Sequence, residues 1–371
     1  MVKKRLFRAL VMLGVLLMVT SCKKEPITIG FTANLTGTGS EVAVTGMYGA
    51  LTAVQLINEQ GGIDGREVVL IIEDDNNSVS GARNADQRLI EQGALGIVGH
   101  MMSGVASESI DYINKQKVVM VSPTISSSNF SGKDDYFYTL MPISEYQSAR
   151  ISKGIMDKGF TKTGFLYQLE NNMFAESMVD DTIVFYEDLD HKVVFKESYS
   201  YIHEASFKRV IDKIEAEGVD SLVIAGSAFD VAKYAQMMAI KGLKIPIFTS
   251  TWTMSPDLMA VGGPTTEGIY TVNAFDSSNS SQAFETFTKA YEATYGTVPI
   301  FSSVYAYEAT NLLLEAIKAS DSMDGPSIKA AMTGLRELDG LQGDISINEY
   351  GDATREVFLF QVKNGEFVKV D

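Results

Sequence analysis

Cysteine, tryptophan and histidine are scarce in this chain, whose 371 residues include one cysteine, one tryptophan and three histidines. A single cysteine excludes a disulfide framework within the chain, and so few sulfur and imidazole groups leave little for a structural zinc site. Basic residues are also outnumbered, since 31 Lys and Arg face 47 Asp and Glu, for a formal net charge of -16. So acidic a surface repels phosphate backbones, and we expect no nucleic-acid partner. We also expect no metal and no cofactor.

The amino terminus has the pattern of a secretory signal. Basic residues cluster between positions 3 and 8, the apolar run Ala9 to Val19 follows, and Thr20-Ser21-Cys22 ends it. The run is too short to remain in a membrane as a spanning helix. Its end resembles the bacterial lipobox, in which the cysteine is lipidated and becomes the first mature residue. We therefore expect residues 1–21 to be removed and Cys22 to anchor an extracytoplasmic protein to a membrane.

Signatures of enzymes are mostly absent. Gly37-Thr38-Gly39 lacks the third glycine of a dinucleotide-binding loop, and the chain has no Walker-type Gly-Lys-Ser/Thr. His203-Glu204 lacks the second histidine of a zincin helix, and no serine lies in a Gly-x-Ser-x-Gly turn. The abundant acidic residues leave a catalytic carboxylate pair open. We expect a protein that is not an enzyme, with an exported hydrolase that uses two carboxylates as the alternative.

Short β-rich segments alternate with amphipathic helices from Ile27 onward, a pattern typical of parallel sheets built from βαβ units. The chain is too long for one ordinary domain and its strands fall into two series, so we predict an α/β protein with two doubly wound lobes. The predicted strands are Ile27–Ala33, Val68–Glu73, Leu95–Gly99 and Val118–Ser122, then Thr163–Tyr167, Val193–Tyr199, Ser221–Ala225 and Pro246–Ser250. Later segments are expected to complete the lobes, with helices at 283–295, 303–319 and 327–335 and strands at 345–347, 357–362 and 367–370.

Polar residues follow two neighbouring strands of the first series. Strand 95–99 continues into His100-Met101-Met102-Ser103-Gly104, and strand 118–121 into Ser122-Pro123-Thr124-Ile125-Ser126. Ligands of open α/β sheets bind outside the carboxyl ends of strands, where helix N-termini offer N–H donors. Hydroxyl and amide groups at these positions favour a small anion, most simply a carboxylate. Alternatively, each serine is an N-cap that serves only its own helix.

Several longer motifs occur in a fixed order along the chain. They are Ile57-Asn58-Glu59-Gln60-Gly61-Gly62-Ile63-Asp64-Gly65-Arg66, Glu73-Asp74-Asp75, Gly99-His100, Ser122-Pro123-Thr124, Tyr305-Ala306-Tyr307-Glu308-Ala309, Leu341-Gln342-Gly343-Asp344-Ile345 and Asn364-Gly365. With these motifs, the chain from about Ile27 to Val370 resembles the type I periplasmic ligand-binding proteins of the branched-chain amino acid, amide and urea ABC transporter family.

The resemblance implies two Rossmann-like lobes joined by three hinge crossovers, which we place near Pro142, Asn273 and Gly343. A small molecule bound between the lobes would favour the closed hinge, and an ABC permease would recognise the closed shape. The expected function is that of a lipid-anchored solute-binding protein of an ABC importer, with a ligand-binding component of a sensor as an alternative. The expected lobes are 26–142 with 273–343, and 143–272 with 344–371.

The resemblance also implies the ligand contacts. The expected ligand-binding residues are Met102, Ser103, Gly104, Thr124, Ser126, Phe174, Ser227 and Trp252, among which Ser103 corresponds to the serine that holds the ligand's carboxylate in the family. Amino-acid binders of the family place an acid near the position of Trp252 to hold the ligand's ammonium. A tryptophan cannot neutralise a buried cation by charge, although its ring face can contact one.

Two ligand classes therefore compete. Either Glu170, Asp230 or Asp276 replaces the missing acid and the ligand is an amino acid, or the ligand is a carboxylate or amide with an apolar or aromatic body. Thioethers and rings line adaptable apolar pockets, which suits the second class. The side chains in question are Met101, Met102, Met173, Phe174, Phe229 and Trp252.

Overall fold

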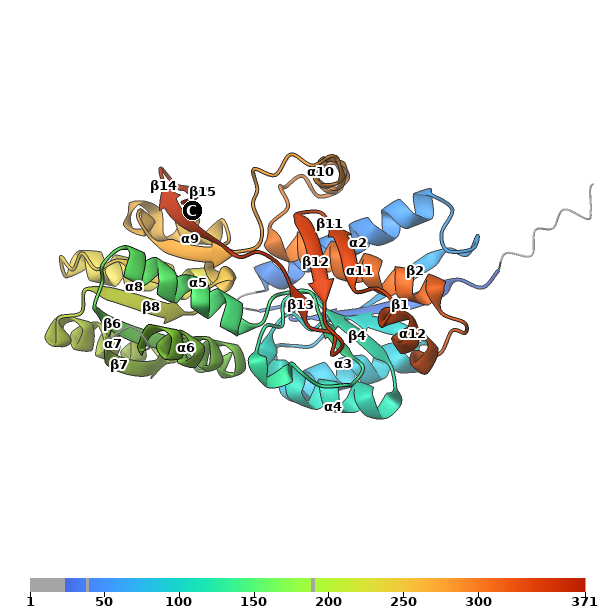
Figure 1. The fold of residues 1–371 in the computed structure, drawn as a ribbon, viewed down its shortest axis with the longest axis horizontal. Helices are drawn as coiled ribbons and strands as arrows, with labels where there is room; N and C mark the ends of the chain where they lie inside the picture. The colour runs from blue at the N-terminus through green and yellow to red at the C-terminus, as the bar shows by residue number, and fades with distance from the viewer. Residues whose placement is uncertain (1–23, 38–39, 188–190, 371) are drawn as a thin grey trace, which may run out of the picture.

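Two sheets with parallel cores form separate halves of the molecule, which lie side by side along its longest axis in the computed structural model (Figure 1). The structure describes residues 24–37, 40–187 and 191–370, so the expected signal segment 1–21 and Cys22 lie outside the described residues. The predicted α/β class with two doubly wound lobes is confirmed. Within the described ranges, none of the helices combines the length and apolar character that crossing a membrane requires.

The first half is built on a five-stranded parallel sheet whose two faces bury different side chains. Val119 and Val121 enter the core that also holds Ala50 of the first helix, whereas Met120 between them enters the core that holds Ile110. This alternation follows from the pleat of a strand that helices cover on both sides. In spatial order the strands are β2 (Val68–Asp74), β1 (Ile27–Ala33), β3 (Gly96–Val98), β4 (Val119–Ser122) and β5 (Phe137–Thr139), and the helices are α2 (Glu41–Glu59), α3 (Val79–Glu91) and α4 (Ala106–Gln116).

The second half repeats this arrangement with a larger sheet. Its strands are, in spatial order, β7 (Lys192–Tyr199), β6 (Lys162–Gln168), β8 (Ser221–Ala225), β9 (Ile247–Thr249), β10 (Tyr270–Asn273), β14 (Phe358–Lys363) and β15 (Glu366–Lys369). Its helices are α5 (Ser144–Asp157), α6 (Asn172–Glu187), α7 (Glu204–Glu217), α8 (Ala228–Ile240) and α9 (Asp257–Gly262). The first five parallel strands of each half have the same spatial order, in which the second strand lies beside the first at the edge. Both halves therefore have a switch point next to their first strand.

The segment 282–354 packs on the first half, where Figure 1 shows it in orange and red. It contains α10 (Gln282–Tyr295), α11 (Phe301–Ala319), α12 (Gly325–Met332) and the small sheet of β11 (Glu337–Gly340), β12 (Gly343–Ile347) and β13 (Ala353–Thr354). α11 packs closely on α2, because Gly49 has no side chain. A Cβ there would lie 2.0 Å from the carbonyl oxygen of Ser303.

The chain passes between the two halves three times, as the resemblance implies. The first passage joins β5 to α5, and the second follows β10. The third joins β13 to β14, later than the position near Gly343 expected from the sequence. The difference arises because β12 and β13 pair with β11 and bury Ile345 and Ile347 in the core of the first half.

Two of these passages are attached to α11. The Tyr305 hydroxyl donates a hydrogen bond to Asn273 Oδ1 at the end of β10, at 2.9 Å. Arg355, in the third passage, donates two hydrogen bonds of 2.9 Å to Glu308 Oε2, and both side chains are buried. Breaking a buried ion pair leaves an uncompensated charge, which is costly. These contacts therefore hold the second and third passages on one helix of the first half.

Candidate functional site

The carboxyl ends of both sheets contribute to one cavity of about 360 Å³. Asn34 follows β1 and Met102 follows β3, while Gln168 ends β6 and Ser227 follows β8. These are the strands that flank the switch point of each sheet, where open α/β sheets bind their ligands. The cavity therefore lies between the two halves, at the position that the strand order favours for a ligand.

A second, smaller cavity of about 30 Å³ adjoins the larger one. Met102 and Trp252 line both cavities and so lie where the two meet. Trp252 belongs to the short 3-10 helix η3 (Thr251–Thr253), and its ring meets that of Phe174 edge to face, with centroids 6.2 Å apart. The smaller cavity has room for about two water molecules. Its lining residues are Val42, Met101, Met102, Ser103, Thr124, Met141, Asn171, Phe174, Trp252 and Phe301.

The structure brings most of the expected ligand-binding residues together at these two cavities. Met102, Ser103, Thr124, Phe174 and Trp252 line the smaller cavity, and Met102, Ser227 and Trp252 line the larger one. The hydroxyls of Ser103 and Thr124 lie at the same cavity, although they come from different strands.

Gly104 and Ser126 line neither cavity and have other contacts. The Gly104 N–H donates to Asn171 Oδ1 of the second half at 2.8 Å. The Ser126 hydroxyl donates to the Pro142 carbonyl and accepts from Gln147 Nε2, both at 2.9 Å. Both residues therefore stabilise the contact between the halves and the first passage of the chain.

Ser103 has a proton available for a ligand. It lies at the start of the short 3-10 helix η1 (Ser103–Val105), and its hydroxyl accepts a hydrogen bond from the Ser126 N–H at 3.4 Å. Thr124 differs, because its hydroxyl donates to the Met101 carbonyl at 2.7 Å. A carboxylate accepts hydrogen bonds only, so the Ser103 hydroxyl suits it and the Thr124 hydroxyl is engaged elsewhere.

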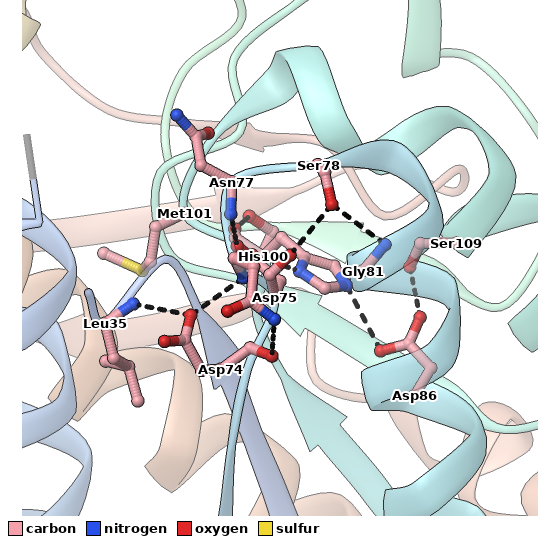
Figure 2. A network of polar contacts seen from close by, with 12 residues as sticks. Leu35, Asp74, Asp75, Asn77, Ser78, Gly81, Asp86, His100, Met101 and Ser109 are labelled. Atoms are coloured by element: carbon pink, nitrogen blue, oxygen red, sulfur yellow. Dashed lines mark hydrogen bonds and ion pairs between the residues drawn. The ribbon is translucent and has the colours of Figure 1, made fainter. Parts of the chain in front are cut away.

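A buried histidine supports the loops on the first side of the cavities. Figure 2 shows the His100 ring between two aspartates, with Nδ1 2.8 Å from Asp75 Oδ2 and Nε2 3.2 Å from Asp86 Oδ1. All three side chains are buried, and Ser109 donates a further hydrogen bond to Asp86. Burial alone would lower the pKa of His100, but the charge of Asp86 and the hydrogen bonds to both aspartates raise it to about 10. The imidazole is therefore protonated at neutral pH.

This network joins the carboxyl ends of three strands of one sheet, β2, β3 and β4. Asp75 Oδ1 accepts the Asn77 N–H at 2.8 Å, and the His100 carbonyl accepts the Ser122 hydroxyl at 2.8 Å. Asn77 lines the larger cavity, and His100 leads directly into the loop of Met102 and Ser103. His100 and its two aspartates therefore position cavity residues that they do not touch.

Amide side chains of the cavities are absent from the expected set. Asn34, Asn77 and Gln168 line the larger cavity, and Asn171 lines the smaller one. Their only signal in the sequence is their position after a predicted strand, which Asn34 and Gln168 follow directly and Asn77 and Asn171 follow at a distance of four residues. Among the three acids considered as ammonium partners, Glu170 and Asp230 line the larger cavity; Asp276 lines a separate surface hollow beside Gln342.

Acidic side chains also meet across the two halves. Glu41, in the first turn of α2, hydrogen-bonds with Asp257, in the first turn of α9. Burial, followed by the hydrogen bond and the charge of Asp257, raises the pKa of Glu41 to about 7. Further bonds between the halves join the Ser127 hydroxyl to the Met173 carbonyl at 2.6 Å and Ser128 to Ser177 at 3.1 Å.

Two halves whose first five strands share one spatial order, three connecting passages and a cavity between facing sheet ends define a two-lobed ligand-binding protein. Residues 26–366 match the family described as periplasmic binding protein, and the chain belongs to that family. One relative, the Leu/Ile/Val-binding protein homolog 2 of Brucella abortus, is 25% identical over 344 residues, which cover 92% of this chain and 91% of the relative.

Two solved structures share the fold. The substrate binding protein LivJ of a branched-chain amino acid transporter from Streptococcus pneumoniae, in complex with isoleucine, has a TM-score of 0.84 and 20% identity, covering 93% of this chain and 100% of LivJ. A solute binding protein of an ABC transporter from R. palustris, in complex with benzoate, has a TM-score of 0.84 and 19% identity, covering 93% of this chain and 95% of that protein.

We predict that the His100 network makes stability depend on pH. A histidine whose pKa is raised in the folded state stabilises it fully below the unfolded pKa of about 6.5, and this contribution is lost as the pH rises through about 10. The free energy of unfolding should therefore fall by a few kcal/mol over this window. Urea denaturation of the wild type, His100→Gln and the exposed control His203→Gln measures it. If the free energy of unfolding fell equally with pH in all three proteins, the prediction would be contradicted.

We also predict that the Glu41 contact makes the distance between the halves depend on pH. A carboxyl group with a raised pKa favours the folded contact at low pH, and this contribution is lost as the pH rises from about 4.5 through about 7. The ligand-free protein should therefore expand over this window, as measured by the radius of gyration in small-angle X-ray scattering. Glu41→Gln should remain compact; expansion of both proteins alike would refute this role.

Proposed function

We propose that this protein is the extracytoplasmic substrate-binding component of an ABC importer and binds a small carboxylate, an amino acid or a close relative of one, between its lobes. The observation that carries the proposal is the position of the two joined cavities, which lie at the facing switch points of the two sheets. Membership of the periplasmic binding protein family supports it, as do relatives named for leucine, isoleucine and valine binding.

Binding and closure follow from the same contacts. A ligand that accepts a hydrogen bond from Ser103 of the first half and touches Trp252 of the second half interacts with both only when the halves are close. Its differential affinity then favours the closed state, whose surface a permease can distinguish from the open one. We place the lobes at 26–142 with 273–354 and at 143–272 with 355–371, which moves the expected boundary from residue 343 to residue 354 because β12 and β13 pair with β11.

We further propose that Cys22 carries a lipid. The sequence motif at residues 19–22 supports this, together with the basic and apolar segments before it. Two or more acyl chains hold a protein stably at a membrane surface, so the mature protein would remain beside its permease. No observation favours the exported hydrolase.

Ser103→Ala should weaken binding of the ligand's carboxylate about ten- to a hundredfold, because a hydrogen bond to a charged group contributes about 1.5 to 3 kcal/mol. A thermal-shift screen of amino acids and aromatic carboxylates, including isoleucine and benzoate, identifies the ligand, and calorimetric titration then gives the affinity. The exposed control Ser278→Ala should bind as the wild type does. Unchanged affinity in Ser103→Ala, with unchanged thermal stability, would remove this serine from the site.

Cys22→Ser should release the protein from the membrane fraction into the soluble extracytoplasmic fraction, since the acyl chains provide the anchor. Cell fractionation with immunoblotting measures the distribution, and mass spectrometry of the mature N-terminus identifies the modification. A wild-type protein with an unmodified cysteine in the soluble fraction would contradict the lipid anchor.

A further inference from the structure

The two cavities differ in charge. The residues that line the smaller cavity are uncharged, and Ser103 offers the hydroxyl donor there. The larger cavity is lined by two carboxylates, Glu170 and Asp230, and by one cation, Lys233. Lys233 Nζ pairs with Glu204 outside the cavity and lies over the Phe207 ring, 4.2 Å from its centroid. The lining of the larger cavity is therefore acidic in character.

Asp230 is buried deeply and held by several donors. Only 3% of it is exposed. It is the third residue of α8 and forms a capping box with Ser227, whose N–H donates to Asp230 Oδ2 at 3.2 Å. The same oxygen also accepts from Gln168 Nε2 at 2.6 Å, the Ser227 hydroxyl at 2.9 Å and the Tyr199 hydroxyl at 3.3 Å. Of these bonds to Asp230 Oδ2, the capping box needs only the one from the Ser227 N–H. The cap therefore does not account for the other donors.

The backbone is shaped to allow this arrangement. A Cβ at Gly226 would lie 1.9 Å from the Tyr199 hydroxyl oxygen, so only glycine admits that hydroxyl beside Asp230. All four hydrogen bonds reach Oδ2, which leaves Oδ1 outside this set. Burial raises the pKa of Asp230, while the hydrogen bonds from Gln168 and Ser227 oppose the rise.

Glu170 is only partly buried, but it too accepts hydrogen bonds from uncharged donors. Ser200 donates to its Oε1, and the Tyr201 N–H donates to its Oε2 at 3.4 Å. All the donors just described for Glu170 and Asp230 are uncharged. A carboxylate removed from water is stabilised best by a partner of opposite charge. A cationic group in the larger cavity would supply that partner.

The position of the two cavities restricts the ligand. The smaller one admits a group of carboxylate size, so the rest of the molecule must continue past Met102 and Trp252, which line both cavities, into the larger one. The ammonium and carboxylate of an α-amino acid are attached to one carbon and cannot be separated by this pair of side chains. The residues that line the smaller cavity are uncharged, so this cavity offers an α-ammonium no opposite charge.

We propose that the ligand is an ω-amino carboxylate, with its carboxylate on Ser103 and its cationic group on Asp230 and Glu170. Its methylene chain passes between Met102 and Trp252, where a thioether and an indole ring provide apolar contacts. This inference rests on the proposed function, because it assigns the two ends of a molecule bound between the lobes.

Matched ligands test the inference on the mature wild-type protein. Calorimetric titration compares γ-aminobutyrate, δ-aminovalerate and ε-aminocaproate with the alkanoates butyrate, valerate and caproate, which lack the ammonium, and with α-aminobutyrate, norvaline and norleucine, which carry it on the α-carbon. We expect at least one ω-amino acid to bind about tenfold or more tightly than its alkanoate and its α-amino isomer. Tighter binding of norvaline, norleucine or leucine overturns the inference and supports the proposed function. Failure of every amino acid and carboxylate to bind overturns both.

Variants then locate the cationic end. Glu170→Gln and Asp230→Asn should reduce the affinity for the ω-amino acid about tenfold and leave that for the alkanoate nearly unchanged. Asp276→Asn, outside the cavities, should change neither. Asp230 also caps α8, so the Asp230→Asn result counts only if that variant unfolds cooperatively on heating. If it does not, the test rests on Glu170→Gln alone. Equal losses for the ω-amino acid and the alkanoate would overturn the assignment of these acids.

Discussion

The site on the first half depends on one buried charge, the protonated ring of His100. Asp75 and Asp86 lie in the interior of the protein, where two carboxylates without a cation would be costly. The imidazolium between them offsets this cost and, through Asn77 and Ser122, connects the ends of three parallel strands. The loop that carries Ser103 begins at this point. Its geometry therefore follows from the interior of the half and not from contact with a ligand.

The second half contributes a different chemistry. Its strand ends present carboxylates held by uncharged donors, whereas the first half presents hydroxyl, amide and thioether groups. A molecule between them meets an acidic side and a side with hydrogen-bond donors, and this polarity orients it. Met102 and Trp252, one from each half, lie between the two environments. Glu170 and Asp230 line the larger cavity, whereas the residues that line the smaller one, Trp252 among them, are uncharged.

The sequence predicts those features that are local or periodic, and it misses those that depend on packing between distant segments. Ile27 to Ala33 is predicted with the bounds of β1, because its apolar residues alternate with threonine and glycine at the period of a strand. The hydroxyls of Ser103 and Thr124 are placed correctly at one cavity, since parallel strands end at the same edge. By contrast, Asp86 lies within a helix, where nothing marks it as the partner of a histidine. The third passage is predicted too early in the chain. β12 pairs with β11 across the Gly340–Gly343 turn, and the sequence of β12 does not distinguish it from a strand of the second half.

The attachment of two passages to α11 has a consequence for motion. Asn273 and Arg355 are held by Tyr305 and Glu308, which are neighbours on one face of the helix. If the lobes turn relative to each other, the axis of rotation must run near this face of α11. Atoms farther from the axis then move over longer distances. A movement that pulled the third passage away from α11 would break the buried Glu308–Arg355 pair, which is costly.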